Sequence, residues 1–148
     1  MLQNKIVFIC TGNTCRSPMA AALAAQIFSK AEIVSAGVNA WGNQPASRHA
    51  ITVMEEDGLC LLKHRATLVS DEIIKSAKLV LTMTETHKMI LLSDYPGEKT
   101  KIFNLGEYAG ENVDISDPFG GSLEEYRACA AQIKALLVKA ARRLEAEI

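Results

Sequence analysis

The chain has 148 residues, and its 16 basic and 17 acidic side chains leave a formal charge of -1. A balance so close to zero excludes binding of nucleic acid or an anionic membrane through a positive field over the whole surface, so any anion must be bound locally. The length suits one domain spanning residues 1–148, the apolar runs are too short to cross a bilayer, and the first residues lack a signal-peptide pattern, so we expect a cytoplasmic protein.

Strand and helix patterns alternate along the chain. Short apolar runs, most of them rich in β-branched residues, predict four strands, at residues 5–9, 32–35, 79–83 and 101–103. Apolar residues recur at helical spacing over 19–27 and 50–54, and later helices are expected after the N-cap candidates Ser70, Thr84 and Ser122. The alternation predicts an α/β fold, a four-stranded parallel sheet with helices on both faces.

The first predicted strand leads into residues 10–18, CTGNTCRSP. Ser17 is a candidate N-cap and Pro18 suits the first position of a helix, so residues 10–16 are expected to form a loop between strand 1 and helix 1. This loop would lie at the carboxyl edge of the sheet, where unpaired N–H groups at the helix N-terminus can bind an anion. Gly12 and Asn13 suit positive φ angles, which would turn successive amides inward.

Cys10 and Arg16 stand at the two ends of this loop. Loop amides, the helix N-terminus and the guanidinium should all lower the pKa of the Cys10 thiol. Arg16 can donate two hydrogen bonds to the oxygens of a phosphate. An isolated cysteine is more often a small buried residue, but the spacing, the preceding strand and the helix start together indicate a nucleophile inside a phosphate-binding loop.

CTGNTCRSP resembles the signature loop of the low-molecular-weight protein tyrosine phosphatases, and the resemblance extends to SAG at 35–37, HRA at 64–66 and DPFGGS at 117–122. It implies a phosphatase that acts on phosphorylated protein substrates through a cysteinyl-phosphate intermediate. The implied roles are Cys10 as nucleophile, Arg16 as the group that binds the transition state, Asp117 as general acid and then base, Thr11, Gly12, Asn13, Thr14 and Cys15 as phosphate-binding loop, and Ser17, Ser35 and His64 as loop support. One positioned carboxyl can serve both proton transfers of such a reaction.

Two positions distinguish this chain within the family pattern. Many members have a bulky aliphatic residue where this chain has Thr14, and an aromatic pair where it has Phe119 and Gly120. The loop and the DPFGGS segment are most similar to those of bacterial protein arginine phosphatases. A threonine hydroxyl can orient a water or a polar group, and a pocket with fewer aromatic walls stacks less well on a phenyl ring. We therefore expect phosphoarginine to be favoured, with phosphotyrosine as the alternative.

Cys15 follows Cys10 closely enough for a reversible disulfide between them, so it is a candidate redox partner; the alternative is a small residue that only fills the loop. Cys60 and His64 have the spacing of metal ligands, but no second pair accompanies them. We therefore expect neither a metal site nor a cofactor.

The remaining polar candidates carry no motif. Cys129 lies on the apolar stripe of the last helix, and His49 and His87 are expected to be structural.

Three rival functions fit the loop less well. An arsenate reductase needs a close pair of resolving thiols, whereas Cys60 and Cys129 are far apart in the sequence. A phosphocarrier would accept phosphate on Cys10 and pass it on. It would gain nothing from Arg16 and Asp117, because these residues would promote hydrolysis of its phosphocysteine. A module that only binds phosphate would not release it from an aryl phosphate. A monomer without a nucleic-acid or membrane partner is expected.

Overall fold

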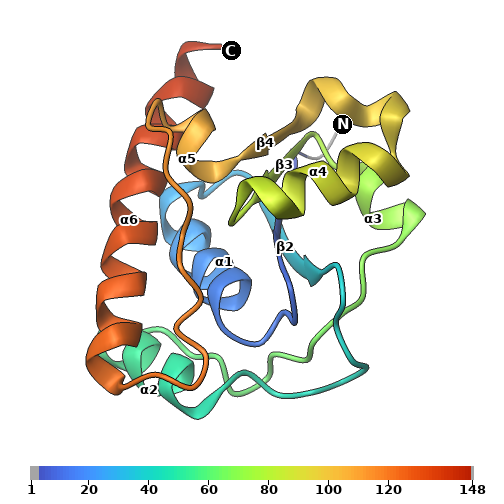
Figure 1. The fold of residues 1–148 in the computed structure, drawn as a ribbon. Coiled ribbons are helices and arrows are strands. Elements are labelled where there is room, and N and C mark those ends of the chain that lie inside the picture. Colours follow the sequence, from blue (N-terminus) through green and yellow to red (C-terminus); the bar gives the residue numbers. More distant parts are fainter. Residues whose placement is uncertain (1–3, 148) are drawn as a thin grey trace.

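A computed structural model describes residues 4–147 and has a four-stranded parallel sheet between two layers of helices (Figure 1). The strand order is β2-β1-β3-β4, and all three pairings are parallel. The strands are β1 Lys5–Cys10, β2 Glu32–Gly37, β3 Leu79–Thr82 and β4 Ile102–Asn104. The predicted α/β fold is confirmed, and each expected strand lies within two residues of its predicted bounds.

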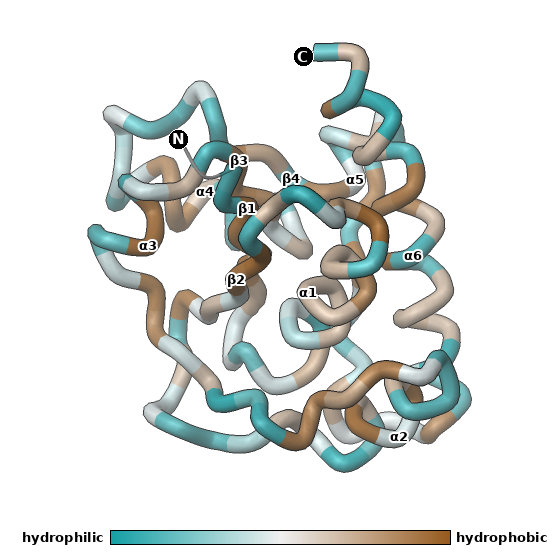
Figure 2. The backbone as a smooth tube through the Cα atoms, turned by 180° about the vertical axis from the view of Figure 1, so that it is seen from behind, coloured by the Kyte–Doolittle hydropathy of each residue, from teal (hydrophilic) through white to brown (hydrophobic). Residues whose placement is uncertain are grey.

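The central strand β1 is buried on both faces, which explains its nearly continuous apolar sequence. Ile6 and Phe8 belong to the core that the strands share with α1, α2 and α6. Val7 and Ile9 point the other way, into a smaller core shared with α3 and α4. Figure 2 shows hydrophobic segments gathered in the strands and hydrophilic ones on the outer turns.

The helices are α1 Arg16–Ile27, α2 Arg48–Glu56, α3 Asp71–Ser76, α4 Glu85–Asp94, the 3₁₀ helix η1 Pro96–Lys101, α5 Leu105–Tyr108 and α6 Leu123–Ala146. Ser70, Thr84 and Ser122 are N-caps, as predicted; each side chain accepts a backbone N–H three residues later. The short helices η1 and α5 were not predicted, although α5 has its own capping box from Asn104 to Glu107. Within residues 4–147, none of the helices is both long and apolar enough to cross a membrane.

The start of α1 differs from the prediction. The helix begins at Arg16 with Cys15 at the N-cap, whose side chain makes no capping hydrogen bond, so Ser17 lies inside the first turn. Its hydroxyl turns toward the loop instead of capping the helix. Gly12 also departs from expectation: of the two residues expected to have positive φ, only Asn13 has it, at 58°. We call residues 10–17 the Cys10 loop.

Residues 109–122, which we call the Asp117 segment, run from α5 to the start of α6 across the front of the molecule, without helix or strand and with turns at 109–110 and 119–120 (orange in Figure 1). Ile115 attaches the segment to the end of β3, because its N–H donates to the carbonyl of Met83. The segment thereby crosses the carboxyl edge of the sheet, where the Cys10 loop begins.

Candidate active site

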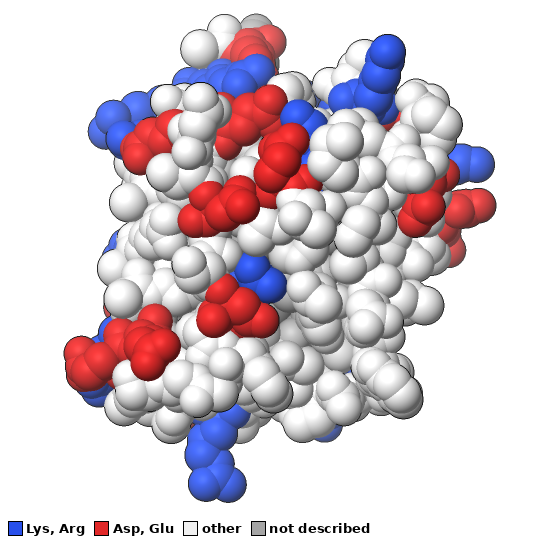
Figure 3. Space-filling view, in the orientation of Figure 1, with Lys and Arg blue, Asp and Glu red and all other residues white. Residues whose placement is uncertain are grey.

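One surface cavity brings together the two segments singled out in the sequence. It is lined by Cys10, Thr11, Gly12, Thr14, Cys15 and Arg16 of the loop, by Asp117 and Phe119, and by Gln44 from the connection between β2 and α2. Gln44 carries no motif and was missed. Figure 3 shows acidic and basic side chains interspersed on this face without a broad basic area. An anion must therefore be bound by the cavity itself.

The Cys10 sulfur lies at the end of β1, buried beneath the loop. Its Sγ is 2.8 Å from the Ser17 hydroxyl, and the backbone N–H of Asn13 donates to it at 3.3 Å. The side-chain amide of Asn13 already donates to the Ser17 oxygen at 2.7 Å, which leaves the Ser17 hydrogen free to donate to sulfur. Both donors favour a thiolate over a thiol.

Asn13 connects the loop to two neighbouring segments. Its side-chain amide also donates to Ser35 at 3.0 Å, and its side-chain oxygen accepts the N–H of Thr67 at 2.9 Å. The Nε2 of His64 lies 2.7 Å from the Asn13 carbonyl oxygen and so donates to it. The structure thus places Ser17, Ser35 and His64 around one asparagine whose left-handed backbone they hold in place. Thr67 was not foreseen.

Opposed effects act on the pKa of the Cys10 thiol. Burial is the largest and raises the pKa, while hydrogen bonds from Ser17 and Asn13 and the positive charge of Arg16 lower it. The prediction of a lowered pKa named the stabilising groups but left out the cost of removing the anion from water, and that cost outweighs them here. These donors therefore limit the cost of forming the thiolate.

Arg16 is almost fully buried and joins the Cys10 loop to the Asp117 segment. Its Nη1 donates to the carbonyl of Ile115 at 2.8 Å, and its Nη2 donates to Thr11 Oγ1 at 3.4 Å. The same Nη2 lies 3.6 Å from Asp117 Oδ2. The guanidinium is thus fixed in direction, with one edge toward the cavity.

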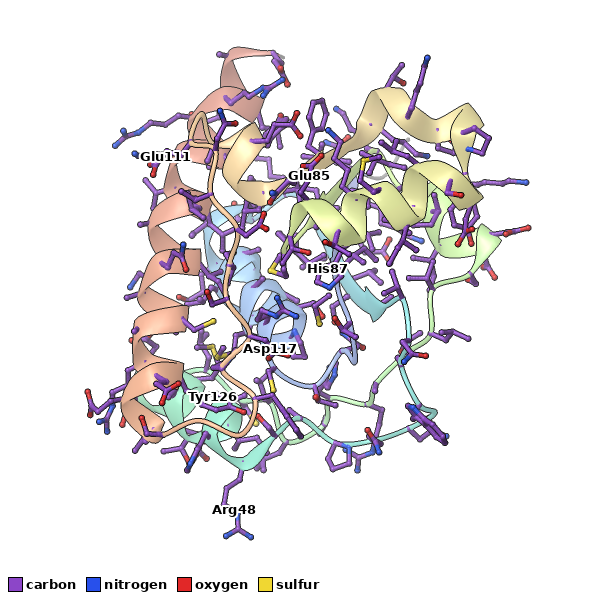
Figure 4. All side chains as sticks on the ribbon, viewed as in Figure 1. Arg48, Glu85, His87, Glu111, Asp117 and Tyr126 are labelled. Atoms are coloured by element: carbon purple, nitrogen blue, oxygen red, sulfur yellow. The ribbon has the colours of Figure 1, made fainter. Side chains whose placement is uncertain are left out.

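Asp117 is half exposed at the mouth of the cavity, with 49% of its side chain accessible (Figure 4). Its Oδ1 accepts the N–H of Phe119 at 3.0 Å in the turn that follows. Oδ2 faces Arg16 and remains accessible to a proton acceptor or donor in the cavity.

The specificity candidates lie on the cavity wall. Thr14 lines the cavity from the loop, with its Oγ1 3.7 Å from the Cys15 sulfur, and Phe119, 71% exposed, stands at the rim. Cys15 is a buried free thiol, 3.3 Å from the hydroxyl of Tyr126 and 3.4 Å from that of Ser47. Its disulfide with Cys10 stays a prediction.

His87 was expected to be structural, yet it touches the loop: its Nε2 is 2.8 Å from Thr11 Oγ1. Its place in the sequence held a signal, because a helix that starts directly after β3 brings its first turn to the carboxyl edge of the sheet. Within residues 4–147, no three side chains of His, Cys, Asp or Glu are grouped so that they could hold a metal ion.

The sequence was compared with protein families and with individual proteins. The model of the family "Low molecular weight phosphotyrosine protein phosphatase" matches residues 5–148. The protein-arginine-phosphatase of Bacillus subtilis (strain 168) is 40% identical over 95% of this chain and 96% of its own. That of Geobacillus stearothermophilus is 42% identical over 97% of both chains. The low molecular weight protein-tyrosine-phosphatase PtpB of Staphylococcus haemolyticus is 39% identical over 91% of this chain and 96% of its own.

Solved structures agree with this result. A YwlE mutant from Bacillus subtilis superposes with a TM-score of 0.91 at 39% identity, covering 95% of this chain and 98% of that one. YwlE arginine phosphatase from Geobacillus stearothermophilus also gives 0.91, at 42% identity, covering 97% and 94%. A YwlE mutant with a phosphorylated active-site serine gives 0.91 at 39% identity and 95% coverage of both chains.

Proposed function

The chain belongs to the low molecular weight phosphotyrosine protein phosphatase family, and we propose that Cys10, Arg16 and Asp117 carry out its reaction. As a member, it is a cysteine-dependent protein phosphatase that acts on phosphorylated protein substrates. The observation that carries the proposed roles is that a sulfur, a guanidinium and a half-exposed carboxyl line one cavity.

In the first step the Cys10 thiolate attacks the phosphorus of the bound side chain. A bond forms between sulfur and phosphorus while the bond from phosphorus to the leaving nitrogen or oxygen breaks. Asp117 gives its proton to the leaving atom, and Arg16 and the loop amides bind the equatorial oxygens, on which charge builds up in the transition state. Because Ile115 fixes Arg16, its donors are in place before the substrate arrives.

In the second step water attacks the phosphorus of cysteinyl-phosphate. Asp117, now ionised, takes a proton from that water, the sulfur–phosphorus bond breaks, and inorganic phosphate leaves with the thiolate restored. The relative with a phosphorylated active-site serine supports a covalent intermediate at the equivalent position.

Phosphoarginine is the substrate we favour, with phosphotyrosine as the second candidate. Thr14 and Phe119 both line the cavity, and Gly120 stands where many family members have the second residue of an aromatic pair. Two relatives of 40% and 42% identity are named protein-arginine-phosphatases, which supports this choice. The tyrosine-phosphatase relative at 39% identity keeps the alternative open.

The choice is tested by measuring kcat/KM on two peptides of matched sequence, one with phosphoarginine and one with phosphotyrosine. We expect the wild-type chain to prefer phosphoarginine, and Thr14→Ile to shift the ratio toward phosphotyrosine by roughly tenfold. Cys10→Ser serves as the inactive control on both peptides. A wild-type preference for phosphotyrosine would assign the chain to the second candidate, and an unchanged ratio in the variant would remove Thr14 as the selector.

We also propose that the chain is a single domain, since the family model spans residues 5–148, and that it acts as a monomer. Sedimentation at several protein concentrations tests the monomer. The arsenate-reductase alternative is disfavoured because Cys60 is exposed whereas Cys129 is buried in α6.

A further inference from the structure

His87 lies beside the reaction cavity, and the two-step reaction assigns it no part. It enters from the first turn of α4, where the N-cap Thr84 accepts its backbone N–H. Its side chain is buried, with 4% of the residue exposed. In Figure 4, His87 and Asp117 approach the middle of this face from different elements. A polar ring at this position needs a reason beyond packing, since an apolar side chain would fill the same space without a polar group to satisfy.

Among the described residues, the ring makes one polar contact, with the Cys10 loop: Nε2 lies 2.8 Å from Thr11 Oγ1. The same oxygen accepts a second contact, from Arg16 Nη2 at 3.4 Å. A threonine hydroxyl has two acceptor sites and one hydrogen to donate, and a guanidinium can only donate. The direction of the His87 contact therefore decides what the Thr11 hydrogen can do.

The surroundings of the other ring nitrogen, Nδ1, show whether His87 or Thr11 donates in this contact. His87 Nδ1 is buried and has no hydrogen-bond partner among residues 4–147. A hydrogen on Nδ1 would be a buried donor without an acceptor, at a cost of about 1–3 kcal/mol, and buried N–H groups without partners are rarer than buried acceptors without them. The hydrogen accordingly resides on Nε2 and is donated to Thr11.

The ring is neutral at ordinary pH. Burial and the charge of Arg16 lower the pKa of His87 to about 4, although the carboxylates of Asp114 and Asp117 act in the opposite direction. The neutral ring carries one N–H hydrogen, on either Nδ1 or Nε2. Because Nδ1 has no acceptor nearby in the described part of the chain, the hydrogen is on Nε2.

His87 and Arg16 both donate to Thr11 Oγ1, so the hydroxyl hydrogen of Thr11 is not used in either contact. Thr11 is exposed and lines the cavity, where that hydrogen can be donated to a ligand. We propose that His87 is a positioning residue that makes the Thr11 hydroxyl a hydrogen-bond donor to a nonbridging oxygen of the bound phosphoryl group. Thr11 Oγ1 and Asp117 Oδ2 lie 3.4 and 3.6 Å from the same Arg16 nitrogen, so both groups stand beside the guanidinium that is proposed to bind the phosphoryl oxygens. A donor fixed there stabilises charge that builds up in the transition state. This inference rests on the proposed function and adds to it a further donor and the group that orients it.

The tautomer is tested directly by long-range ¹H–¹⁵N correlation of the imidazole in the uniformly labelled wild-type protein at neutral pH. We expect Nε2 to carry the hydrogen and Nδ1 to resonate as an unprotonated nitrogen. A hydrogen on Nδ1 would overturn the inference, because Thr11 would then donate to the ring and not to the substrate. That result would leave the roles of Cys10, Arg16 and Asp117 intact, so the two proposals fail separately.

The catalytic consequence is tested by a double-mutant cycle in kcat/KM. We expect Thr11→Val and His87→Leu each to lower kcat/KM by about tenfold, and the double variant to lose about tenfold rather than a hundredfold, since both remove one donated bond. His87→Gln, whose amide can reach Thr11 as a donor, should stay within about threefold of wild type. Thr86→Ala, an exposed neighbour on α4, is the control for helix damage.

Independent losses that multiply in the double variant would overturn the coupling, as would a loss in His87→Gln equal to that in His87→Leu. If His87→Leu does not fold, the cycle is run with His87→Asn, whose shorter side chain does not reach Thr11, and the same outcomes apply. Full activity of Thr11→Val would also refute the donor role.

Discussion

The Cys10 loop and the Asp117 segment form the two sides of one cavity but are held in very different ways. In the loop, Asn13, Cys15, Arg16 and Ser17 are buried, and hydrogen bonds tie Asn13 to two neighbouring segments, β2 through Ser35 and the connection between α2 and α3 through His64 and Thr67. The Asp117 segment is mostly exposed, with only Ile115 and Pro118 buried within it. We infer that the two sides differ in mobility. The buried loop holds the phosphoryl group in a fixed geometry, whereas the exposed segment lets the Asp117 carboxyl adjust its position to different leaving groups.

Arg16 is where the two sides meet, so its replacement should have the largest effect. Arg16→Lys keeps the charge but loses the planar donors and the bond to Ile115. We expect kcat/KM to fall on the order of 10² to 10³-fold, as measured with a phosphorylated peptide. Arg142→Lys, at an exposed position of α6, is the matched control. A loss of less than about threefold would mean that the guanidinium does not bind the transition state.

The adaptable side is probed by Asp117→Asn, which keeps the shape of the side chain and removes the proton. We expect kcat to fall by about 10²-fold, most strongly for poor leaving groups, while inorganic phosphate binds as before. Measurements on aryl phosphates of graded leaving-group pKa check this, with Asp57→Asn on the surface as control. Equal losses across the series would contradict the role of Asp117 as general acid.

The fixed side is probed by Ser17→Ala, which removes a donor to the Cys10 sulfur. Loss of a hydrogen bond to the thiolate raises the pKa of Cys10 further, so less thiolate is present at a given pH below that pKa. The acid limb of the profile of kcat/KM against pH should move up by roughly one pH unit, with Ser29→Ala as control. A limb that stays in place would show that Ser17 only packs.

The last comparison leaves activity aside and concerns stability, which two glycine replacements should change to different extents. A Cβ at Gly37 would lie 2.5 Å from the carbonyl oxygen of Thr11, whereas a Cβ at Gly120 meets nothing within 4 Å and only strains a φ of 80°. We expect Gly37→Ala to cost about 1–3 kcal/mol of unfolding free energy and Gly120→Ala about 1 kcal/mol. Denaturant titration of both variants tests the contrast, and a larger cost at Gly120 would reverse the comparison of the two regions.

The sequence predicted what depends on local patterns. Strands, caps and the position of the Cys10 loop follow from β-branched runs, Ser or Thr before helices, and a strand that leads into a glycine-containing turn. The sequence predicted Ser17 as a helix N-cap, whereas its hydroxyl contacts the Cys10 sulfur. Which of these two partners the hydroxyl takes depends on the three-dimensional fold and not on the local sequence. Gln44, Thr67 and His87 were missed for the same reason: each comes from a distant segment, and only the fold brings it to the loop.

The central claim is that phosphate passes through the Cys10 sulfur, and rapid quenching of the Asp117→Asn variant during turnover of a phosphorylated peptide tests it most directly. The account predicts that mass spectrometry of the quenched protein finds phosphate on the peptide that contains Cys10, and that Cys10→Ser shows no turnover. Full turnover without such an adduct, or phosphate attached to a different residue, would contradict it.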